Sequence, residues 1–548
     1  MMFLTAAARP LAAQARSRSG GQGRVCQRRH EPPEGEKFMT TAQICITAVI
    51  ILYLCFVIFT GIMIGRRSKK SAEGFYLGGR GMGPLVTAMS AEASDMSSWL
   101  LMGLPGVAYL SGVADAGWTA IGLALGTYLN FLLVAKRIRR YSVRLDAITI
   151  PAFISKRYQE KKPVIMCIAS LIILIFFVPY VASGLAAIGK LFNSLFGWNY
   201  MVSVLIGAAV IISYTSVGGF NAVATMDLIQ SIIMTCALVV ITGFGIYQAG
   251  GLEVVVENAK ALPGYLSLTQ THDVATGTAM PYGFINSVSM LAWGLGYFGM
   301  PHILVRFMAI RDEKELKLSR RIASVWVVIS MTVAICIGMI GYSVSKAGRI
   351  PVLEGSKSET VIVAIANLLS SYGFFTAIVA GLILAGILAA TMSTADSQLL
   401  AAASAFSENI LQDVFGVKLT AKQTMLVARL TVVVIAVIAV FLAMDPNSSV
   451  FTIVSFAWAG FGATFGPAIL SALFWKRSNR QGILAGLVAG GIMVFVWKFQ
   501  VRPMGGMWNI YELLPAFLVA TLAIVVVSLL TEKPSPEIEA VFDEVNAD

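Results

Sequence analysis

A series of apolar segments, each long enough to cross a lipid bilayer, constrains this chain more than any other feature. A helix needs roughly 20 apolar residues to span a hydrocarbon core about 30 Å thick, and such segments recur from Thr41 to Leu530. Hydrophobic residues make up 57% of the chain and charged residues only 13%, which is too apolar for a soluble domain that must cover itself with polar side chains. The sequence therefore predicts an all-α polytopic membrane protein.

About thirteen spans are predicted, joined by loops too short to hold a soluble catalytic domain, so we expect no enzyme activity. The predicted spans are 42–64, 83–112, 116–135, 163–190, 200–217, 226–248, 283–308, 321–345, 366–402, 425–444, 448–474, 482–499 and 511–531. Lys and Arg gather after the first, third, seventh and eleventh spans, which predicts cytoplasmic loops there. The N-terminus is therefore expected outside and the tail 532–548 inside, and the net charge of +12 reflects topology rather than nucleic-acid binding.

The first 38 residues do not fit this topology, because their basic residues would lie on the outer face. No acidic residue precedes Glu31. We expect either that translation begins at Met39 or that residues 1–38 are a removable or disordered extension. The membrane domain is then 39–531.

Cysteine and histidine offer no sign of a cofactor or a transition-metal site. The six cysteines are isolated from one another and the chain has only three histidines, so neither a disulfide framework nor a zinc enzyme is expected.

Two acidic residues lie inside apolar runs, Asp95 in the second span and Asp396 in the ninth. An ionised carboxylate in hydrocarbon costs several kcal/mol unless a partner meets it, so such residues commonly mark an ion or substrate path. The serines around Asp95 compete for backbone hydrogen bonds and Pro105 removes a donor, which predicts local unwinding and free carbonyl oxygens. The alternative is a kinked helix that only packs.

The ninth span carries a matching set of oxygens. Ala390, Ser393 and Thr394 stand at i, i+3 and i+4 and therefore share one helix face. They could complete a sodium site opposite the second span, although a Ser/Thr pair more often serves helix packing.

The seventh span carries an aromatic stripe interrupted by glycines. Trp293, Tyr297 and Pro301 are spaced by four residues, and the intervening glycines weaken the helix. A broken helix lined by aromatic rings suits a small solute. The alternative is ordinary packing.

Several strings resemble the sodium:solute symporter family, most of all its sodium/proline symporters. They are Leu-Gly-Gly-Arg at 77–80, Ala-Ser-Asp-Met-Ser at 93–97, Trp-Leu-Leu-Met-Gly-Leu-Pro-Gly at 99–106, the stretch 293–307, and Ile-Leu-Ala-Ala-Thr-Met-Ser-Thr at 387–394. The resemblance implies thirteen spans, an outer N-terminus and a LeuT-like core of two inverted five-helix repeats near 83–248 and 283–474. It also implies sodium-coupled uptake of L-proline across the cytoplasmic membrane by alternating access.

The resemblance also implies roles for individual residues. Carbonyls of Ala93, Met96 and Ala390 and hydroxyls of Ser393 and Thr394 would bind sodium, with Asp95 as the acid required for tight binding. The residues implied for the proline pocket, and for its junction with the ion site, are Ser97, Tyr180, Trp293, Tyr297 and Pro301. Arg80 and Asp227 match positions that affect transport, although Arg80 could be a topology signal and Asp227 a helix-start charge.

Two residues depart from the family pattern. Ser98 stands where proline symporters usually have glycine, so the identity of the solute is left open. Glu92 lies one turn before Asp95 and could couple a proton, although a solvent-facing or ion-paired Glu is the commoner case. The alternatives are a sodium symporter for another small solute, a proton-coupled variant, and a transporter-like membrane sensor.

Overall fold

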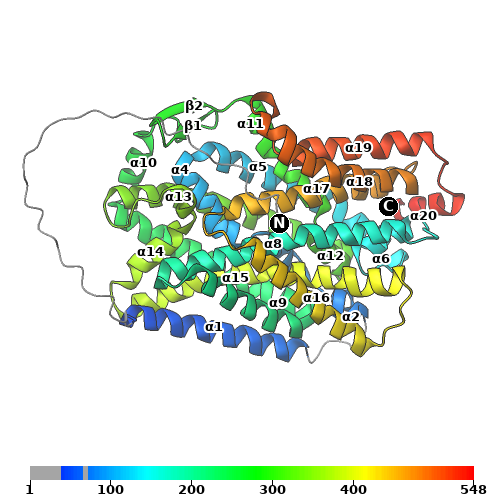
Figure 1. Ribbon diagram of the computed structural model, residues 1–548, viewed down its shortest axis with the longest axis horizontal. Helices are drawn as coiled ribbons and strands as arrows, with labels where there is room; N and C mark the ends of the chain where they lie inside the picture. Colours follow the sequence, from blue (N-terminus) through cyan, green and yellow to red (C-terminus); the bar gives the residue numbers. More distant parts are fainter. Residues whose placement is uncertain (1–38, 66–71, 548) are drawn as a thin grey trace, which may run out of the picture. The chain divides into compact units, whose positions relative to one another are not determined.

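The computed structural model describes residues 39–65 and 72–547, so the expectation about residues 1–38 lies outside the described residues. The chain from Thr40 onward forms one unit. Its longer helices follow the apolar segments (Figure 1). The helices are α1 (Thr41–Gly65), α2 (Ala72–Leu77), α3 (Pro84–Asp95), α4 (Leu104–Ser111), α5 (Val113–Leu129), α6 (Ala135–Arg144), α7 (Ile150–Arg157), α8 (Val164–Phe196), α9 (Tyr200–Ala249), α10 (Leu252–Lys260), α11 (Phe284–Leu291), α12 (Pro301–Ala309), α13 (Leu316–Lys346), α14 (Val361–Ser370), α15 (Phe374–Ser404), α16 (Ala421–Leu442), α17 (Val450–Phe474), α18 (Arg480–Val496), α19 (Leu513–Leu530) and α20 (Pro536–Asn546).

Within the described residues, ten helices are long and apolar enough to cross a membrane. The bent pair Phe284–Gly299 and Pro301–Ala309 makes an eleventh if it is one span. The two other predicted spans correspond to shorter apolar helices, Trp99–Ser111 and Tyr200–Ser213. The predicted start of the ninth span at residue 366 is wrong, because α14 ends at Ser370 and α15 begins only at Phe374.

The second predicted span is broken in its middle, as expected. Helix α3 ends at Asp95, and Met96 has the non-helical angles φ −76° and ψ 68°. The chain resumes as a π-helical turn, η2 (Trp99–Gly103), before α4. Pro105 falls in the first turn of α4, which continues η2 as one helix from Trp99 to Ser111, and its ring nitrogen donates no hydrogen bond there. The serine-rich stretch is therefore the place where the helix opens.

The seventh span is broken too. A 3₁₀ segment, η4 (Ala292–Gly299), follows α11, and α12 begins at Pro301 after a bend of 47°. The glycines of η4 have a packing reason: a Cβ on Gly294 would lie 2.2 Å from the carbonyl oxygen of Gly122 in α5. A Cβ on Gly296 would lie 1.9 Å from Nε1 of Trp458 in α17. Any side chain at either position would therefore force η4 away from its neighbours.

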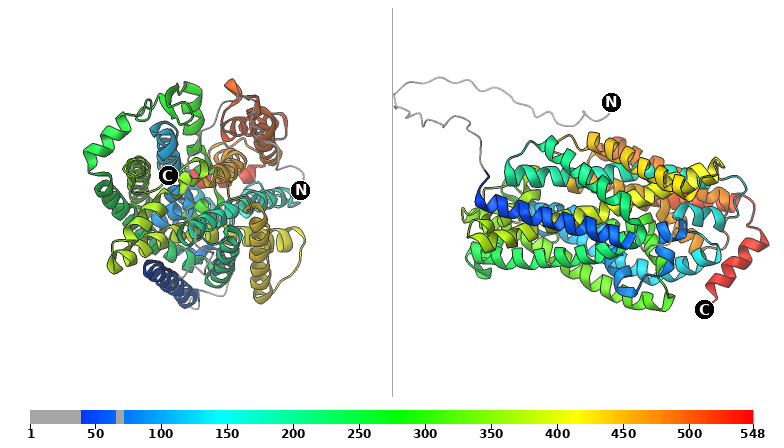
Figure 2. Two further views of the ribbon diagram at one scale, coloured as in Figure 1. Left: turned by 60° about the vertical axis from the view of Figure 1, so that its left-hand side comes forward. Right: turned by 90° about the horizontal axis from the view of Figure 1, so that it is seen from below.

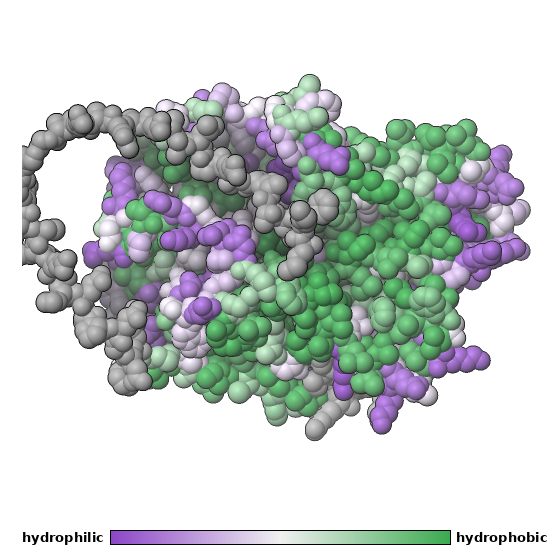
Figure 3. Space-filling model, in the orientation of Figure 1, coloured by the Kyte–Doolittle hydropathy of each residue, from purple (hydrophilic) through white to green (hydrophobic). Residues whose placement is uncertain are grey.

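The two ends of the helix bundle carry its non-spanning elements (Figure 1). Strands β1 (Gln270–Asp273) and β2 (Thr278–Pro281) pair antiparallel at one end, with Gln270 opposite Pro281. The short helix α20 lies at the opposite end, and Figure 2 shows it there from a second direction. Between the ends, apolar side chains cover much of the surface, while hydrophilic ones gather toward the ends (Figure 3). That band is the surface expected to face lipid.

Helix α3 lies inside the bundle. It packs against α9, α12, α13 and α15, while η4 packs against α5 and α17. Every residue of α3 from Thr87 to Asp95 is buried. The two broken spans therefore meet the long helices at the centre of the protein rather than at the lipid surface.

Candidate functional site

Four oxygen atoms from α3 and α15 meet beside the break in α3. The Ser393 hydroxyl donates to the Ala93 carbonyl at 2.8 Å, and the Thr394 hydroxyl lies 3.4 Å from the same oxygen. Both hydroxyls also contact the Ala390 carbonyl, at 3.1 and 3.2 Å. None of these four residues is more than 3% exposed. Carbonyl and hydroxyl oxygens freed at a helix break are ligands that replace the water shell of sodium, so this predicted set fits the ion.

Met96 belongs to the same break. Its backbone is the first non-helical position after α3, and its sulfur lies 3.5 Å from the Ser330 hydroxyl of α13. Its predicted role as a carbonyl ligand stays a prediction.

The Asp95 carboxylate faces a different direction. Its Oδ2 accepts a short hydrogen bond from the Tyr297 hydroxyl of η4, and that hydroxyl also lies 3.4 Å from Glu92. Asp95 and Ala93 are two residues apart and so lie on different sides of α3. The structure therefore brings Ala93, Ala390, Ser393 and Thr394 together and places the Asp95 side chain with η4.

The predicted solute residues lie in a buried aromatic cluster. The Trp293 ring stacks on Tyr511 with centroids 5.2 Å apart and lies 6.1 Å from Trp99, and Tyr297 meets Trp458 edge-on at 5.2 Å. The rings of these five residues are no more than 1% exposed. The aromatic cluster is therefore closed on itself, and a solute would have to separate these rings to enter.

Tyr180 links α8 to the break in α3. Its hydroxyl donates to the Asp95 carbonyl at 3.3 Å, and the Ser97 hydroxyl accepts from the Trp99 amide at 3.4 Å. Pro301 lies further along the broken span, where it lines a cavity of about 20 Å³ together with Arg306. A volume of that size holds about one water molecule. Of the five predicted solute residues, Trp293 and Tyr297 lie in the aromatic cluster, Ser97 and Tyr180 lie at the break of α3, and Pro301 lines the small cavity.

A buried ion pair that the sequence interpretation missed lies beside this small cavity. Arg306 Nη2 lies 3.1 Å from Asp227 Oδ2, and the Ser90 hydroxyl donates to the same oxygen at 2.6 Å. Arg306 also donates to the Ser397 hydroxyl and to the His302 carbonyl. The pair joins α3, α9, α12 and α15. Asp227 is therefore not a charge at a helix start. The sequence signal for this ion pair was one acid and one arginine in separate apolar spans.

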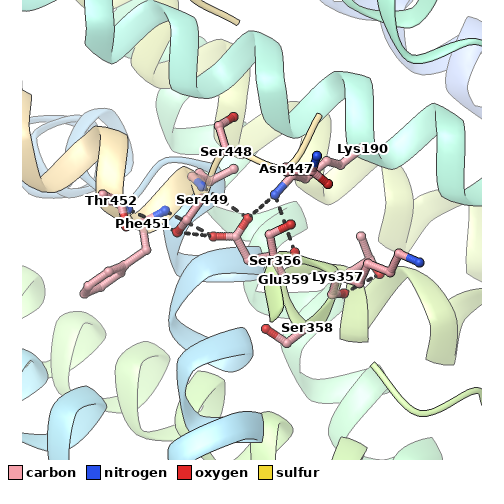
Figure 4. Close-up of polar contacts among 12 residues, drawn as sticks. Lys190, Ser356, Lys357, Ser358, Glu359, Asn447, Ser448, Ser449, Phe451 and Thr452 are labelled. Atoms are coloured by element: carbon pink, nitrogen blue, oxygen red, sulfur yellow. Dashed lines mark hydrogen bonds and ion pairs between the residues drawn. The ribbon is translucent and has the colours of Figure 1, made fainter. Parts of the chain in front are cut away.

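A second buried ion pair, which the sequence interpretation also missed, is drawn in Figure 4. Lys190 of α8 contacts Glu359 at 2.5 Å, with side chains 7% and 5% exposed. Glu359 lies in η6 (Gly355–Thr360) and accepts from the Val450 and Phe451 amides at 3.1 and 3.3 Å. A carboxylate at the first amides of α17 is favoured by the helix dipole. The structure thus holds two buried ion pairs near the broken helices, Arg306–Asp227 and Lys190–Glu359.

Arg80 is a structural connector. It stands in a left-handed conformation (φ 54°) and donates to the carbonyls of Met308 and Ala147 at 3.0 and 2.9 Å. It also lies 3.1 Å from Glu73. Burial lowers the pKa of the guanidinium, which Glu73 partly offsets. Arg80 thus binds α2 to α12 and to the chain before α7.

Broken central helices, a sodium-type oxygen set and a closed aromatic cluster together define an ion-coupled solute transporter. The model of the sodium:solute symporter family matches residues 75–490, and the chain belongs to that family, which confirms the sequence interpretation. The protein is 38% identical to the sodium/proline symporter of Escherichia coli over 92% of this chain and 97% of that one. It is 40% identical to the osmoregulated proline transporter OpuE of Bacillus subtilis, over 85% and 92%.

Solved structures confirm the fold. A sodium-coupled sialic acid symporter in an outward-open state superposes with a TM-score of 0.71 at 18% identity, covering 90% of this chain and 99% of that one. A nucleobase-cation-symport-1 family transporter in a closed conformation gives 0.51 at 14% identity, over 86% and 98%. The predicted all-α, LeuT-like fold class is therefore confirmed.

Proposed function

We propose that this protein carries L-proline into the cell together with sodium, by alternating access across the cytoplasmic membrane. The observation that carries the proposal is the contact of Ser393 and Thr394 with the Ala93 carbonyl at the break of α3. Family membership and the names of the relatives support sodium and proline as the pair of ligands.

Sodium acts by joining α3 to α15. The Ala93 and Ala390 carbonyls and the Ser393 and Thr394 hydroxyls turn from one another toward the ion. Asp95, whose side chain faces η4, contributes its negative charge nearby rather than a ligand to this set. An ion held there fixes the broken end of α3 and so prepares the solute pocket beside it.

Proline binds in a pocket that Ser97, Tyr180, Trp293, Tyr297 and Pro301 form when the aromatic cluster opens. Aromatic faces cover the apolar ring of the solute, while amides exposed at the two helix breaks bind its carboxylate. Rocking of one group of helices against the other then opens Arg306–Asp227 at one end or Lys190–Glu359 at the other. Each sodium ion gains about 2.3 kcal/mol per 100 mV of membrane potential.

Arg140, Arg144, Arg311 and Lys476 lie at the end of the bundle that carries α20. Basic residues gathered at that end support a cytoplasmic position for it. The N-terminus then lies outside and the C-terminal tail inside. The transport core is two inverted repeats near 83–248 and 283–474, within a membrane domain of residues 39–531.

Uptake of labelled proline into proteoliposomes tests the proposal. An inward sodium gradient should drive uptake, and replacing sodium by choline should abolish it. Ser393→Ala and Thr394→Val should raise the sodium concentration for half-maximal uptake. Thr391→Val is the matched control, because its hydroxyl donates only to Ile387 within α15, at 2.9 Å.

The outcome also separates the alternatives. Sodium-driven uptake of another amino acid or organic solute, with proline ignored, would keep the ion site and overturn the solute. Uptake driven by a pH gradient without sodium would overturn sodium coupling.

A further inference from the structure

Glu92 and Asp95 form a carboxylate pair that the proposed sodium site does not use. They stand three residues apart on α3 and both are fully buried. Their shared face points to α5 and η4: Thr127 and Tyr297 hydroxyls lie 3.4 Å from Glu92 Oε2, and the same Tyr297 hydroxyl binds Asp95. The expectation of a solvent-facing or ion-paired Glu92 is wrong.

Three buried acceptor oxygens at this place have no hydrogen-bond partner. They are Glu92 Oε1, Asp95 Oδ1 and Asn130 Oδ1, where Asn130 directly follows α5 and lies one turn after Thr127. The Asn130 amide nitrogen is engaged with the Tyr297 carbonyl at 3.1 Å, which fixes this side chain beside η4. Unpaired buried acceptors are rare and call for a missing donor or cation.

Three other buried acids of this protein are each neutralised by a basic side chain. Asp227 pairs with Arg306, Glu359 with Lys190, and Glu512 with Lys498 at 3.0 Å. Among the residues that the structure describes, no Lys, Arg or His forms an ion pair with Glu92 or Asp95. Two neighbouring carboxylates in a low-dielectric interior repel each other and lose their hydration. A cation bound between them, or a proton held by one of them, removes this repulsion.

We propose that Glu92, Asp95, Thr127 and Tyr297 bind a second alkali cation, which is transported with the first. Carboxylate and hydroxyl oxygens are hard ligands suited to such an ion. The set differs from the Ala93–Ser393 site, which lies on another side of α3, and Tyr297 connects it to the aromatic cluster. The proposal rests on the proposed function and adds a second coupling ion to it.

Sodium binding to the purified full-length protein, measured with ²²Na⁺ in the absence of solute, tests the site directly. We expect two ions bound per wild-type chain and one in Glu92→Gln. Glu512→Gln is the matched control, because it removes a buried acid elsewhere and should leave two. One ion bound to the wild type would overturn the proposal without needing the variant to fold.

Coupled flux in proteoliposomes gives the second measurement. Wild-type protein should move two sodium ions per solute, and Glu92→Gln one. With a tenfold sodium gradient and no membrane potential, the limiting solute accumulation should fall from about a hundredfold to about tenfold. A sodium-to-solute ratio that Glu92→Gln leaves unchanged would overturn the proposed site. Transport of one proton per solute in place of the second sodium ion would overturn it too. Two ions bound by a protein that ignores proline would overturn only the proposed solute.

Discussion

The Arg306–Asp227 pair gives the sharpest prediction of this structure. Asp227→Asn removes the negative partner but keeps the shape of the side chain. Arg306, only 2% exposed, then keeps hydrogen bonds to Ser90 and Ser397 but loses its ion pair. Because the pair joins α3, α9, α12 and α15, its loss should destabilise the state in which this end is closed.

The size of the effect follows from the burial of both charges. Breaking a buried ion pair by removing one partner costs about 3–5 kcal/mol, since an uncompensated charge remains. At 1.4 kcal/mol per tenfold change, that is a shift of about 10² to 4 × 10³ in the equilibrium between closed and open states. In the open state, water solvates Arg306 in place of Asp227. The loss of the ion pair therefore destabilises mainly the closed state.

Alkylation of an introduced cysteine measures the shift. Ser404 lines the small cavity beside Arg306 and is 7% exposed, so Ser404→Cys in a chain without native cysteines reports opening at this end. We expect alkylation to be about 10² to 4 × 10³ times faster in Asp227→Asn. Arg306→Met combined with Asp227→Asn removes both charges and should return the rate most of the way to the parent.

Two results would refute this reasoning. An alkylation rate in Asp227→Asn equal to that of the parent would mean that the pair does not hold the closed state. A double variant as reactive as the single one would mean that the buried charge is not the cause. Thermal unfolding of each variant separates opening from general loss of structure.

Three further changes have defined outcomes. Gly296→Ala places a methyl group against Trp458, and such overpacking should lower the free energy of unfolding by about 1–3 kcal/mol, seen as a lower melting temperature. Trp293→Leu removes a stacked ring from the aromatic cluster and should raise KM for the solute about tenfold, with less effect on the maximal rate of uptake. The hydrogen bond to Asp543 raises the pKa of Lys476 above 10.5, so the contribution of Lys476 to the docking of α20 should be complete below pH 10.5 and lost as pH rises through the raised value. Arg140 and Arg144 still hold α20, so limited proteolysis of the tail should speed up only modestly at that pH, and more when salt also screens these contacts.

Local features that depend on sequence spacing were predictable. The break after Asp95 follows from consecutive serines, and the shared face of Ala390, Ser393 and Thr394 follows from their i, i+3 and i+4 spacing on α15. Their partner Ala93 was implied by the family resemblance. The aromatic stripe at Trp293 and Tyr297 did mark a broken helix. Each of these inferences needs only one helix, or one helix and a nearby break.

Pairings between distant helices were not predictable from one sequence. Arg306 stood near the end of a predicted span, where a basic residue commonly signals topology, and nothing along the chain linked it to Asp227. Lys190 and Glu359 are separated by 169 residues, with Glu359 in what was expected to be a loop. The direction of the Asp95 side chain depends on the rotation of α3, which the packing of four neighbouring helices decides.

The rotation of α3 connects these contacts to coupling. At 3.6 residues per turn, Ser90 and Ala93, three residues apart, lie on one side of α3, and Asp95 lies on another side. Ser90 contacts the Arg306–Asp227 pair, Ala93 contacts Ser393, and Asp95 contacts Tyr297. A helix that shifts or turns as one body changes all three contacts together. An ion bound at Ala93 or beside Asp95 therefore biases the Arg306–Asp227 pair through α3, without any direct contact between the ion and the pair.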